Sequence, residues 1–549
     1  MAYVITQSCC NDASCVEVCP VDCIHPAPEE PDFATAEMLY IHPDECIDCG
    51  ACVDACPVGA VHADFELPDH LSDYLSINAD YFAWVGETPE PGAHPPAGPK
   101  KEDQTEPLRV AVVGSGPAGW FLADELAGSR RANVEVTLFD RLATPHGLIR
   151  HGVAPDHLET KQVASMFEDF TKRQPISVRL NVEIGRDVTH DELLEHHHCV
   201  VYATGASEGR ALGIPGEGLR GSNAAADFVN WYNGHPDWIE LDPPLQHERA
   251  IIIGNGNVAL DVARLLLVGP DELTSLSDMV SHAVEALAGS SIEEVVVIGR
   301  RGPEHAAFTS AELLALINHP DINVVIDETE LASLPDADPE ERTAGSFGAH
   351  RKADLLRRAA AGSNGGPKRL VLRFGLSPAA VLGDEQVEGL TVARTGGEDD
   401  IETIPAGLVL RATGYRTAPT AGVPFDERAG RFAHEGGRVT DPDSGEVVPR
   451  TYVVGWAKRG ATGVIGTNRA CAVETAAAIF DDYVDGRFPE NGGDPSALDA
   501  LLAERGIAAV DLAGWRRLDE HEQALGKDIG RPRVKIANRD EQLKVASRA

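Results

Sequence analysis

The chain has 549 residues, 43% of them hydrophobic, and a formal net charge of −40. This length exceeds what one hydrophobic core can serve and predicts about three or four domains, and the hydrophobic content is that of a folded globular protein. The acidic charge argues against nucleic acid as a partner. The sequence has no signal peptide and no run near the roughly 18 apolar residues of a membrane span, so we expect a cytoplasmic protein.

The first segment, residues 1–85, carries two cysteine runs of the same spacing. The second run has the pattern Cys-x2-Cys-x2-Cys-x3-Cys-Pro, which is the loop that wraps an iron–sulfur cubane. The first run repeats it with an aspartate at the second position. In two-cluster ferredoxins the fourth cysteine of each run crosses to the other cluster. Crossing therefore predicts one ligand set of Cys19, Cys46, Cys49 and Cys52, and another of Cys9, Cys15, Cys56 and, at the variant position, Asp12.

The set that contains Asp12 is one thiolate short, and two cluster types fit it. It can be a 3Fe–4S cluster, or a 4Fe–4S cluster whose fourth iron is held by the carboxylate. A zinc site also favours Cys-x2-Cys pairs, but two loops that each end in Cys-Pro favour clusters. Residues 1 to about 70 resemble a bacterial two-cluster ferredoxin of the seven- or eight-iron type, including CPVDCI at 19–24 and MLYIHP at 38–43. The resemblance implies a small α+β domain.

Residues 86–107 are rich in proline and glycine and are interpreted as a linker. The region before it is acidic, because residues 1–99 contain eighteen Asp and Glu and no Lys or Arg. Such a segment favours a basic surface. A basic stretch later in the chain could supply it, although a solvated helix face explains that stretch equally well. Its basic residues are Arg351, Lys352, Arg357, Arg358, Lys368, Arg369 and Arg373.

The second module begins with an apolar strand at 108–113, a glycine turn and a helix-like segment. The turn has the Gly-x-Gly-x-x-Gly pattern at Gly114, Gly116 and Gly119. Glycines permit the tight turn and a close approach of the backbone to a pyrophosphate, and an acidic residue after the next strand binds the ribose. Asp140 holds that place. Residues 108–207 are therefore predicted to be the first part of an FAD-binding domain.

A second site of this kind follows an apolar strand at 250–253. Its turn consists of Gly254, Asn255, Gly256 and Asn257. After the next strand, at 294–298, Arg300 and Arg301 stand where an NAD site would have an acid. Two arginines there suit a 2′-phosphate and favour NADP. The alternative is that they cap a surface loop. Residues 208–405 are predicted to be the NADP-binding domain.

Two similar strings, VVYATGA at 200–206 and VLRATGY at 409–415, suggest that the chain leaves the FAD domain after the first and returns near the second. Residues 406–490 would then complete the FAD domain. The predicted fold is α/β, with two Rossmann-like domains, the NADP domain being inserted in the FAD domain, preceded by a small α+β ferredoxin-like domain. Residues 491–549 form a C-terminal extension to which no chemistry is assigned.

From residue 108 onward the chain resembles adrenodoxin reductase and its bacterial ferredoxin–NADP reductase relatives. The strings that carry the resemblance are VAVVGSGPAG, HGLIRHGVAPDH, GNGNVALDVAR, VIGRRGP, FTSAEL and GWAKRGATGVIGT. It implies FAD contacts from Ala118, Asp140, Leu148, Val182, Trp456, Gly463, Val464 and Ile465. It implies NADP contacts from Asn255, Gly256, Asn257, Val258, Arg300, Arg301, Glu312 and Gly463.

Hydride transfer from nicotinamide to flavin needs orientation more than a general base. His157 and Glu312 match family residues near the two rings and are the candidates for positioning and proton management, although His157 could equally be structural. The expected reaction passes hydride from NADPH to FAD and then single electrons to the clusters. The final acceptor could be the fused segment, a separate ferredoxin or a cytochrome. Two alternatives are an electron-input subunit of a larger NADPH-dependent enzyme and a non-enzymatic redox sensor.

Overall fold

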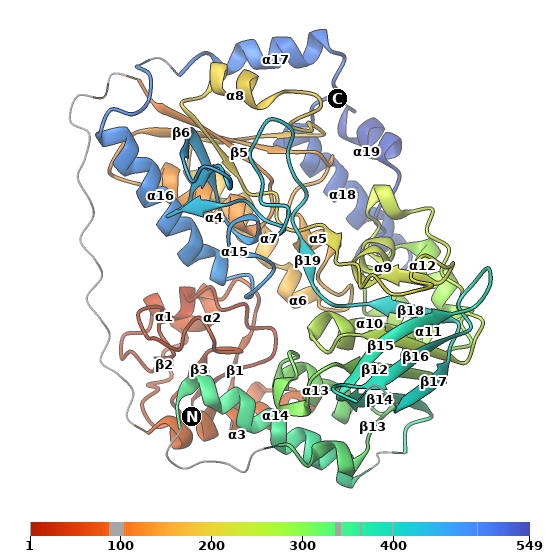
Figure 1. The fold of residues 1–549 in the computed structure, drawn as a ribbon. Coiled ribbons are helices and arrows are strands. Elements are labelled where there is room, and N and C mark those ends of the chain that lie inside the picture. Colours follow the sequence, from red (N-terminus) through yellow and green to blue (C-terminus); the bar gives the residue numbers. More distant parts are fainter. Residues whose placement is uncertain are drawn as a thin grey trace.

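The computed structural model describes residues 2–86, 104, 106–334, 342–362, 365–397, 400–490 and 492–548. Three parts lie side by side in Figure 1: an N-terminal module at the lower left, a sheet with helices above it, and a second sheet at the lower right. Most of the predicted linker, residues 86–107, lies outside the described residues. Among the described helices, none is long and apolar enough to cross a membrane.

The N-terminal module has the predicted α+β character. Strands β1 and β4 pair antiparallel, as do β2 and β3, and a longer helix closes the module. Short helices α1 and α2 each carry cysteines of one run. The elements are β1 (Tyr3–Ile5), α1 (Ser14–Glu17), β2 (Ile24–His25), β3 (Tyr40–Ile41), α2 (Ala51–Ala55), β4 (Val61–Ala63), η1 (Asp64–Glu66), η2 (Asp69–Leu71) and α3 (Asp73–Val85).

The upper part is built on a seven-stranded sheet in the order β20-β21-β22-β8-β5-β6-β7. The strands from β22 to β7 are parallel, and β8 and most of β5 at the centre of the sheet are buried, as expected for a sheet with helices on both faces. The strands are β5 (Leu108–Val113), β6 (Val134–Asp140), β7 (Ile176–Leu180), β8 (Cys199–Tyr202), β20 (His434–Glu435), β21 (Arg438–Thr440) and β22 (Val447–Val453). The helices are α4 (Pro117–Gly128), α5 (Leu148–His151), α6 (Leu158–Lys161), α7 (Val163–Arg173), α8 (His190–His196), α15 (Trp456–Arg459) and α16 (Thr467–Val484).

The lower right part is a six-stranded parallel sheet in the order β10-β18-β11-β12-β14-β13, with a small antiparallel sheet β15-β16-β17 beside it. The strands are β10 (Ser222–Ala224), β11 (Arg249–Ile253), β12 (Glu294–Gly299), β13 (Ile322–Ile326), β14 (Lys368–Phe374), β15 (Leu376–Leu382), β16 (Gly389–Arg394), β17 (Ile401–Pro405) and β18 (Leu408–Arg411). The helices are α9 (Ala225–Tyr232), η3 (Pro236–Trp238), α10 (Asn257–Leu267), α11 (Pro270–Ser275), α12 (Ser281–Ala288), η4 (Pro303–His305), α13 (Ser310–Asn318), η5 (Glu328–Leu331) and α14 (Ala344–Ala361).

The predicted domain boundary between residues 405 and 406 is wrong. Strand β18 lies inside the second sheet, where it pairs with β10 and β11, so the chain leaves this sheet only after Arg411. A two-stranded link of β9 (Glu208–Gly209) and β19 (Tyr415–Arg416) then joins the two parts. The string at 409–415 therefore belongs mostly to the inserted domain. Sequence similarity to 200–206 reflects an equivalent strand in each of two similar folds, not a return to the first one.

The C-terminal extension packs against the first sheet and its helices. Val510 bridges Leu180 of β7, which extends that sheet's edge. Arg150 donates to both carboxylate oxygens of Glu522 at 2.9 and 2.6 Å, and both residues are buried. Removing either partner of this buried bidentate pair would leave an uncompensated buried charge and destabilise the folded protein. The helices are α17 (Pro495–Glu504), α18 (Leu512–Asp528) and α19 (Arg539–Ala546).

The N-terminal module docks on helix α14 of the inserted domain. Phe347 is 2% exposed and meets Tyr40 and Tyr81 edge-on, with ring centroids 5.5 and 5.4 Å apart. Trp84 at the end of α3 donates to Ser346 Oγ at 3.1 Å. This aromatic cluster joins the two parts at the bottom of Figure 1, where α3 and α14 lie together.

Charge plays a smaller part in this docking than the sequence suggested. Two members of the predicted basic stretch face the module, because Arg351 lies 3.9 Å from Asp80 and Lys352 lies 3.7 Å from Glu37. The others bind within the inserted domain, as Arg369 does with Glu294. Part of the basic stretch therefore faces the acidic module, and the rest forms contacts within the inserted domain.

Replacing Phe347 with alanine should destabilise the protein by about 3–5 kcal/mol, because it leaves a cavity beneath two tyrosine rings. The matched control is Phe65→Ala, since Phe65 is 66% exposed and its loss should cost less than about 0.5 kcal/mol. Urea denaturation of both variants measures the difference. Equal effects would show that the aromatic contact does not hold the module in place.

Candidate functional site

The first glycine turn has the geometry of a dinucleotide cradle. Gly114 has φ +111°, and a Cβ there would lie 2.3 Å from the carbonyl oxygen of Ala203. A Cβ on Gly119 would lie 2.1 Å from the oxygen of Gly114, so helix α4 packs closely on the turn. Gly116 has open space in front of it, and α4 begins at the next residue. The backbone amides at this helix start are therefore free to meet a phosphate group.

The other predicted residues of this site gather around that turn. Asp140 ends β6 and accepts from Ser115 N at 3.0 Å and from Ser115 Oγ at 2.6 Å. Val182 N donates to Asp140 O at 2.8 Å, which places the buried Val182 beside it. A Cβ on Gly147, just before Leu148, would lie 3.1 Å from Gly116 Cα.

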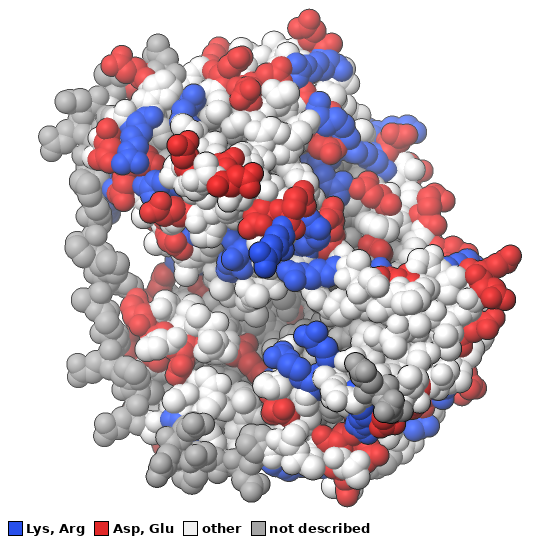
Figure 2. All heavy atoms as spheres, in the orientation of Figure 1, with Lys and Arg blue, Asp and Glu red and all other residues white. Residues whose placement is uncertain are grey.

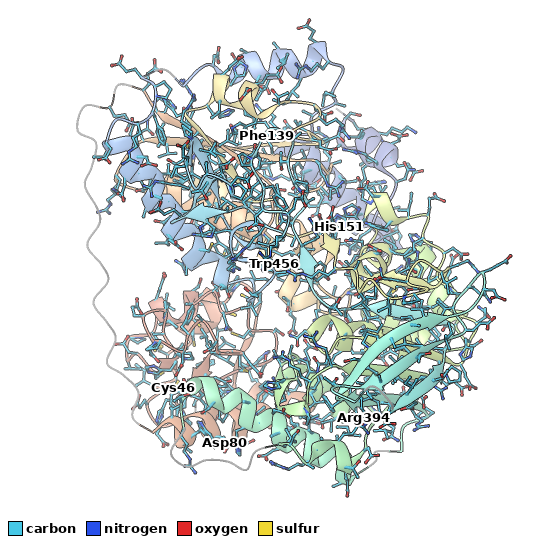
Figure 3. All side chains as sticks on the ribbon, in the orientation of Figure 1. Cys46, Asp80, Phe139, His151, Arg394 and Trp456 are labelled. Carbon is cyan, nitrogen blue, oxygen red and sulfur yellow. The ribbon has the colours of Figure 1, made fainter. Side chains whose placement is uncertain are left out.

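Helix α15 borders the site next to the start of α4. A Cβ on Gly455 would lie 2.4 Å from the Cβ of Ala118, so the start of α15 lies against the start of α4. Trp456 follows directly, and its indole donates to Thr462 O at 2.9 Å. Figure 3 places Trp456 at the underside of the upper part, facing the gap between the three parts.

The second glycine turn has nearly the same backbone geometry as the first at its leading glycine. Gly254 has φ +114°, and a Cβ there would lie 2.3 Å from Ala412 O; Gly256 again has open space in front of it. Helix α10 begins at Asn257, whose Oδ1 accepts from Thr309 N at 2.8 Å. Asn255 O accepts from Phe308 N at 2.9 Å. These bonds tie the turn to the start of α13, which carries Glu312.

Arg300 and Arg301 follow strand β12 and are exposed. Their backbone oxygens are bound, since Thr395 Oγ1 donates to Arg300 O at 2.6 Å and Gly375 N to Arg301 O at 3.0 Å. Neither guanidinium has an ion pair with any described residue. Figure 2 shows further Lys and Arg side chains on both sides of the hollow in the middle of the molecule. Such a surface suits an anionic ligand.

His157 and Glu312 are brought together by a buried arginine. Arg264 on α10 donates to His157 Nε2 at 3.0 Å and lies 3.4 Å from Glu312 Oε2. It also donates to both oxygens of Asp156 at 2.8 and 2.9 Å, and to Asp261 at 3.0 Å. Because arginine can only donate, His157 Nε2 accepts and the ring proton is assigned to Nδ1.

The electrostatics of this cluster follow from burial and from Arg264. Burial acts to raise the pKa of Asp156, but the charge and hydrogen bonds of Arg264 outweigh it and hold the pKa well below its usual range. Burial and the charge of Asp261 raise the pKa of Glu312, against the opposite effect of His157 and Arg264. Ligand atoms of His157, Asp261 and Glu312 lie within 4.8 Å of one another. A metal ion is not needed there, since Arg264 already supplies the positive charge.

The predicted loop Gly463–Ile465 lies where the upper part meets the N-terminal module. Gly466 N donates to Cys10 O at 2.8 Å, and a Cβ on Gly466 would lie 1.8 Å from Asn11 O. Arg469 Nη1 donates to Asp12 O at 3.1 Å. The first cysteine run therefore rests directly on this loop, backbone against backbone.

The four cysteines predicted as one ligand set lie at one small cavity. Cys19, Cys46, Cys49 and Cys52 line it together with Cys23, which is outside the predicted set. Burial is the main cause that raises the pKa of Cys15, and electrostatic effects of Cys9, Asp12, Cys56 and Cys52 add to it, so these groups are its neighbours. A cavity lined by thiols suits an iron–sulfur cluster, and the crossed assignment of ligands stays a prediction.

Comparisons with known proteins give matches for both the N-terminal module and the part of the chain that follows it. Residues 39–62 match the 4Fe-4S binding domain, and residues 108–301 match the pyridine nucleotide-disulphide oxidoreductase family. The whole chain aligns at 46% identity with 96% of a protein of Mycobacterium bovis named probable ferredoxin/ferredoxin–NADP reductase. The chain belongs to the ferredoxin/ferredoxin–NADP reductase family. Among solved structures, FprA of Mycobacterium tuberculosis in complex with NADPH matches 80% of this chain and all of its own, with 39% identity and a TM-score of 0.75.

Several residues of the site were not indicated by the sequence. Arg264 and Asp261 are three residues apart on a largely apolar helix, and both are part of GNGNVALDVAR. Their role becomes evident only in the tertiary structure, where Arg264 contacts His157 and Glu312. Glu37 of the N-terminal module accepts from Ser310 N at 2.8 Å at the start of α13. Gly466 lies within GWAKRGATGVIGT but was not predicted to contact the first cysteine run, and Arg469 had no sequence signal.

Replacing Arg264 with leucine should destabilise the protein by about 3–5 kcal/mol near neutral pH, because it leaves buried carboxylates without their cation. The matched control is Arg220→Leu, since Arg220 pairs with Asp242 on the surface and should contribute at most about 1 kcal/mol. Urea denaturation gives both values. Similar losses in the two variants would contradict the role of Arg264.

The loss of stability caused by Arg264→Leu should depend on pH. A carboxyl with a lowered pKa stabilises the folded state above its unfolded pKa, about 3.9 for aspartate, and this contribution disappears as the pH falls. The difference between wild type and Arg264→Leu should therefore shrink in acid.

Proposed function

We propose that this chain is an NADPH–ferredoxin oxidoreductase whose own N-terminal module is the first one-electron acceptor. The observation that carries the proposal is the contact of the first cysteine run with Gly466, next to the loop Gly463–Ile465. The relatives support it, because the matched FprA structure is titled as a complex with NADPH and the full-length relative is named for both halves. A module docked at this loop needs no diffusion to receive electrons.

The first cradle fits FAD. Its open glycine, Gly116, leaves space for a pyrophosphate, and Asp140 lies at the strand end where a ribose would bind. Residues assigned to hold FAD are Gly114, Gly116, Ala118, Gly119, Asp140, Leu148, Val182, Trp456, Gly463, Val464 and Ile465.

The second cradle fits NADPH. Gly256 leaves the same open space, and Arg300 and Arg301, which form no ion pair with a described residue, suit a 2′-phosphate. Residues assigned to hold NADPH are Asn255, Gly256, Asn257, Val258, Arg300, Arg301, Glu312 and Gly463. When bound, NADPH supplies a hydride, FAD divides the electron pair, and iron–sulfur clusters carry single electrons.

His157, Arg264 and Glu312 are proposed to position the nicotinamide end. Arg264 fixes the tautomer of His157 and the direction of Glu312, so both side chains present a defined polar surface. Glu312, whose pKa is raised by burial, can hold a proton at its carboxyl more readily than an exposed glutamate. Orientation of this kind is the main contribution a protein makes to hydride transfer.

The set Cys19, Cys46, Cys49 and Cys52 is proposed to hold a 4Fe–4S cluster, and the set Cys9, Cys15 and Cys56 a 3Fe–4S cluster. Asp12 Oδ2 accepts from Ser14 Oγ, and Cys10 Sγ donates to Asp12 Oδ1 at 3.7 Å. Both carboxylate oxygens thus have partners within their own loop, which favours the three-iron type over a cluster with Asp12 as a ligand.

Anaerobic addition of NADPH, followed by flavin absorbance and by electron paramagnetic resonance of frozen samples, tests the proposal. Reduced-cluster signals should appear on the timescale of steady turnover. Flavin bleaching with both clusters still oxidised would contradict a fused acceptor. The oxidised protein should give the signal of a three-iron cluster, since oxidised four-iron clusters are silent. Asp12→Cys should abolish this signal and add about one iron per chain, and Asp69→Cys, at an exposed position outside both sets, should do neither.

The double variant Arg300→Ala/Arg301→Ala should raise the KM for NADPH by about 10- to 100-fold and leave the KM for NADH unchanged, because only NADPH has the 2′-phosphate. Arg428→Ala is the control, as Arg428 is exposed and lies outside both cradles. Steady-state kinetics with both nucleotides provide the measurement. An equal rise for NADPH and NADH would mean that the pair does not bind this phosphate.

A further inference from the structure

The two ends of the N-terminal module differ in what covers them. The end with Cys9, Cys15 and Cys56 faces the loop at 463–466, and the reductase backbone lies against it. Arg469 reinforces this end by a 2.8 Å ion pair with Glu17. The reductase part therefore covers some of the module's surface at this end.

The end with the four-thiol cavity is open to solvent. Cys49 is exposed, and Ile47, between two of the ligands, is 58% exposed. Three further large apolar side chains that flank the ligands are also exposed, in a chain that buries most of its apolar residues. Figure 3 places Cys46 in the lower left part, away from Trp456. This apolar centre consists of Val18, Val21, Ile47 and Val53.

Acidic residues flank the members of this apolar centre along the chain. All are exposed, and none forms an ion pair with another described residue. No lysine or arginine occurs in residues 1–99 to offset them. The acidic rim consists of Asp22, Asp44, Glu45, Asp48 and Asp54.

We propose that a basic one-electron carrier protein docks on this face and receives its electrons from the four-cysteine end. An apolar centre within a charged rim is the pattern of a protein interface, and the rim charge sets the rate of encounter and selects the partner. A second acidic ferredoxin would be repelled. The inference rests on the proposed function: two carriers are each reduced by one electron for every NADPH oxidised to NADP+, with release of one proton.

The test measures binding without turnover. The probe is oxidised cytochrome c, a basic protein that accepts one electron, and its Kd for the oxidised protein is measured by surface plasmon resonance. The patch variant is Asp44→Lys/Glu45→Lys/Asp54→Lys. Asp22 and Asp48 are left intact because their φ values, +49° and +58°, make substitution costly.

The control variant, Asp384→Lys/Glu385→Lys/Glu520→Lys, changes the net charge by the same amount at exposed sites in other parts of the chain. At low ionic strength the patch variant should bind at least about tenfold more weakly than wild type, and the control less than about threefold. At about 0.15 M salt the wild-type affinity should fall, because surface charges are screened.

Equal weakening in both variants would show attraction by net charge alone and would overturn the proposal. Unchanged binding in the patch variant would place the docking site elsewhere. A bacterial two-cluster ferredoxin, which is acidic, serves as the second probe; tighter binding of this protein than of cytochrome c would also overturn the proposal.

Reduction of ferricyanide by NADPH separates this inference from the proposed function. The patch variant should reduce ferricyanide at the wild-type rate and cytochrome c at least about tenfold more slowly at low ionic strength. If wild type fails to reduce ferricyanide, the proposed function itself fails. If both acceptors are reduced normally by the patch variant, only the docking surface is wrong.

Discussion

The arrangement of this protein depends on one backbone contact, between Gly466 and the Cys10–Asn11 peptide. A side chain at Gly466 would overlap Asn11 O, so only glycine lets the two loops meet. The hydrogen bond from Gly466 N to Cys10 O fixes their register. The first cysteine run lies on one side of this contact and the predicted flavin loop on the other, so the contact sets how the two are placed relative to each other.

A second constraint is the close packing beneath each glycine turn. Gly114 and Gly254 have nearly the same φ and each crosses an alanine carbonyl at the end of a neighbouring strand. The two turns differ in the charge at the end of the next strand, since Asp140 ends β6 and Arg300 and Arg301 follow β12. An acid at that place suits ribose hydroxyls, and arginines suit a 2′-phosphate.

The inserted domain is held to its neighbours by contacts of different kinds. Arg264 joins it to the His157 loop through buried charge, and Phe347 joins it to the N-terminal module through aromatic packing. Glu37 adds a carboxylate at the start of α13, where helix amides favour negative charge. The N-terminal module therefore contacts both the loop at 463–466 and the helix that bears Glu312.

The sequence by itself determined the local features. Cysteine spacing, two glycine turns and the residues at two strand ends are set by neighbours in the chain, so the fold class and the family were predictable from them. Tertiary structure decided what depends on distant residues. Asp12 and Arg469 are 457 positions apart, and no spacing rule connects them. Strand β18 was assigned to the wrong sheet because its pairing with β10 and β11 depends on tertiary packing and not on its own amino-acid sequence.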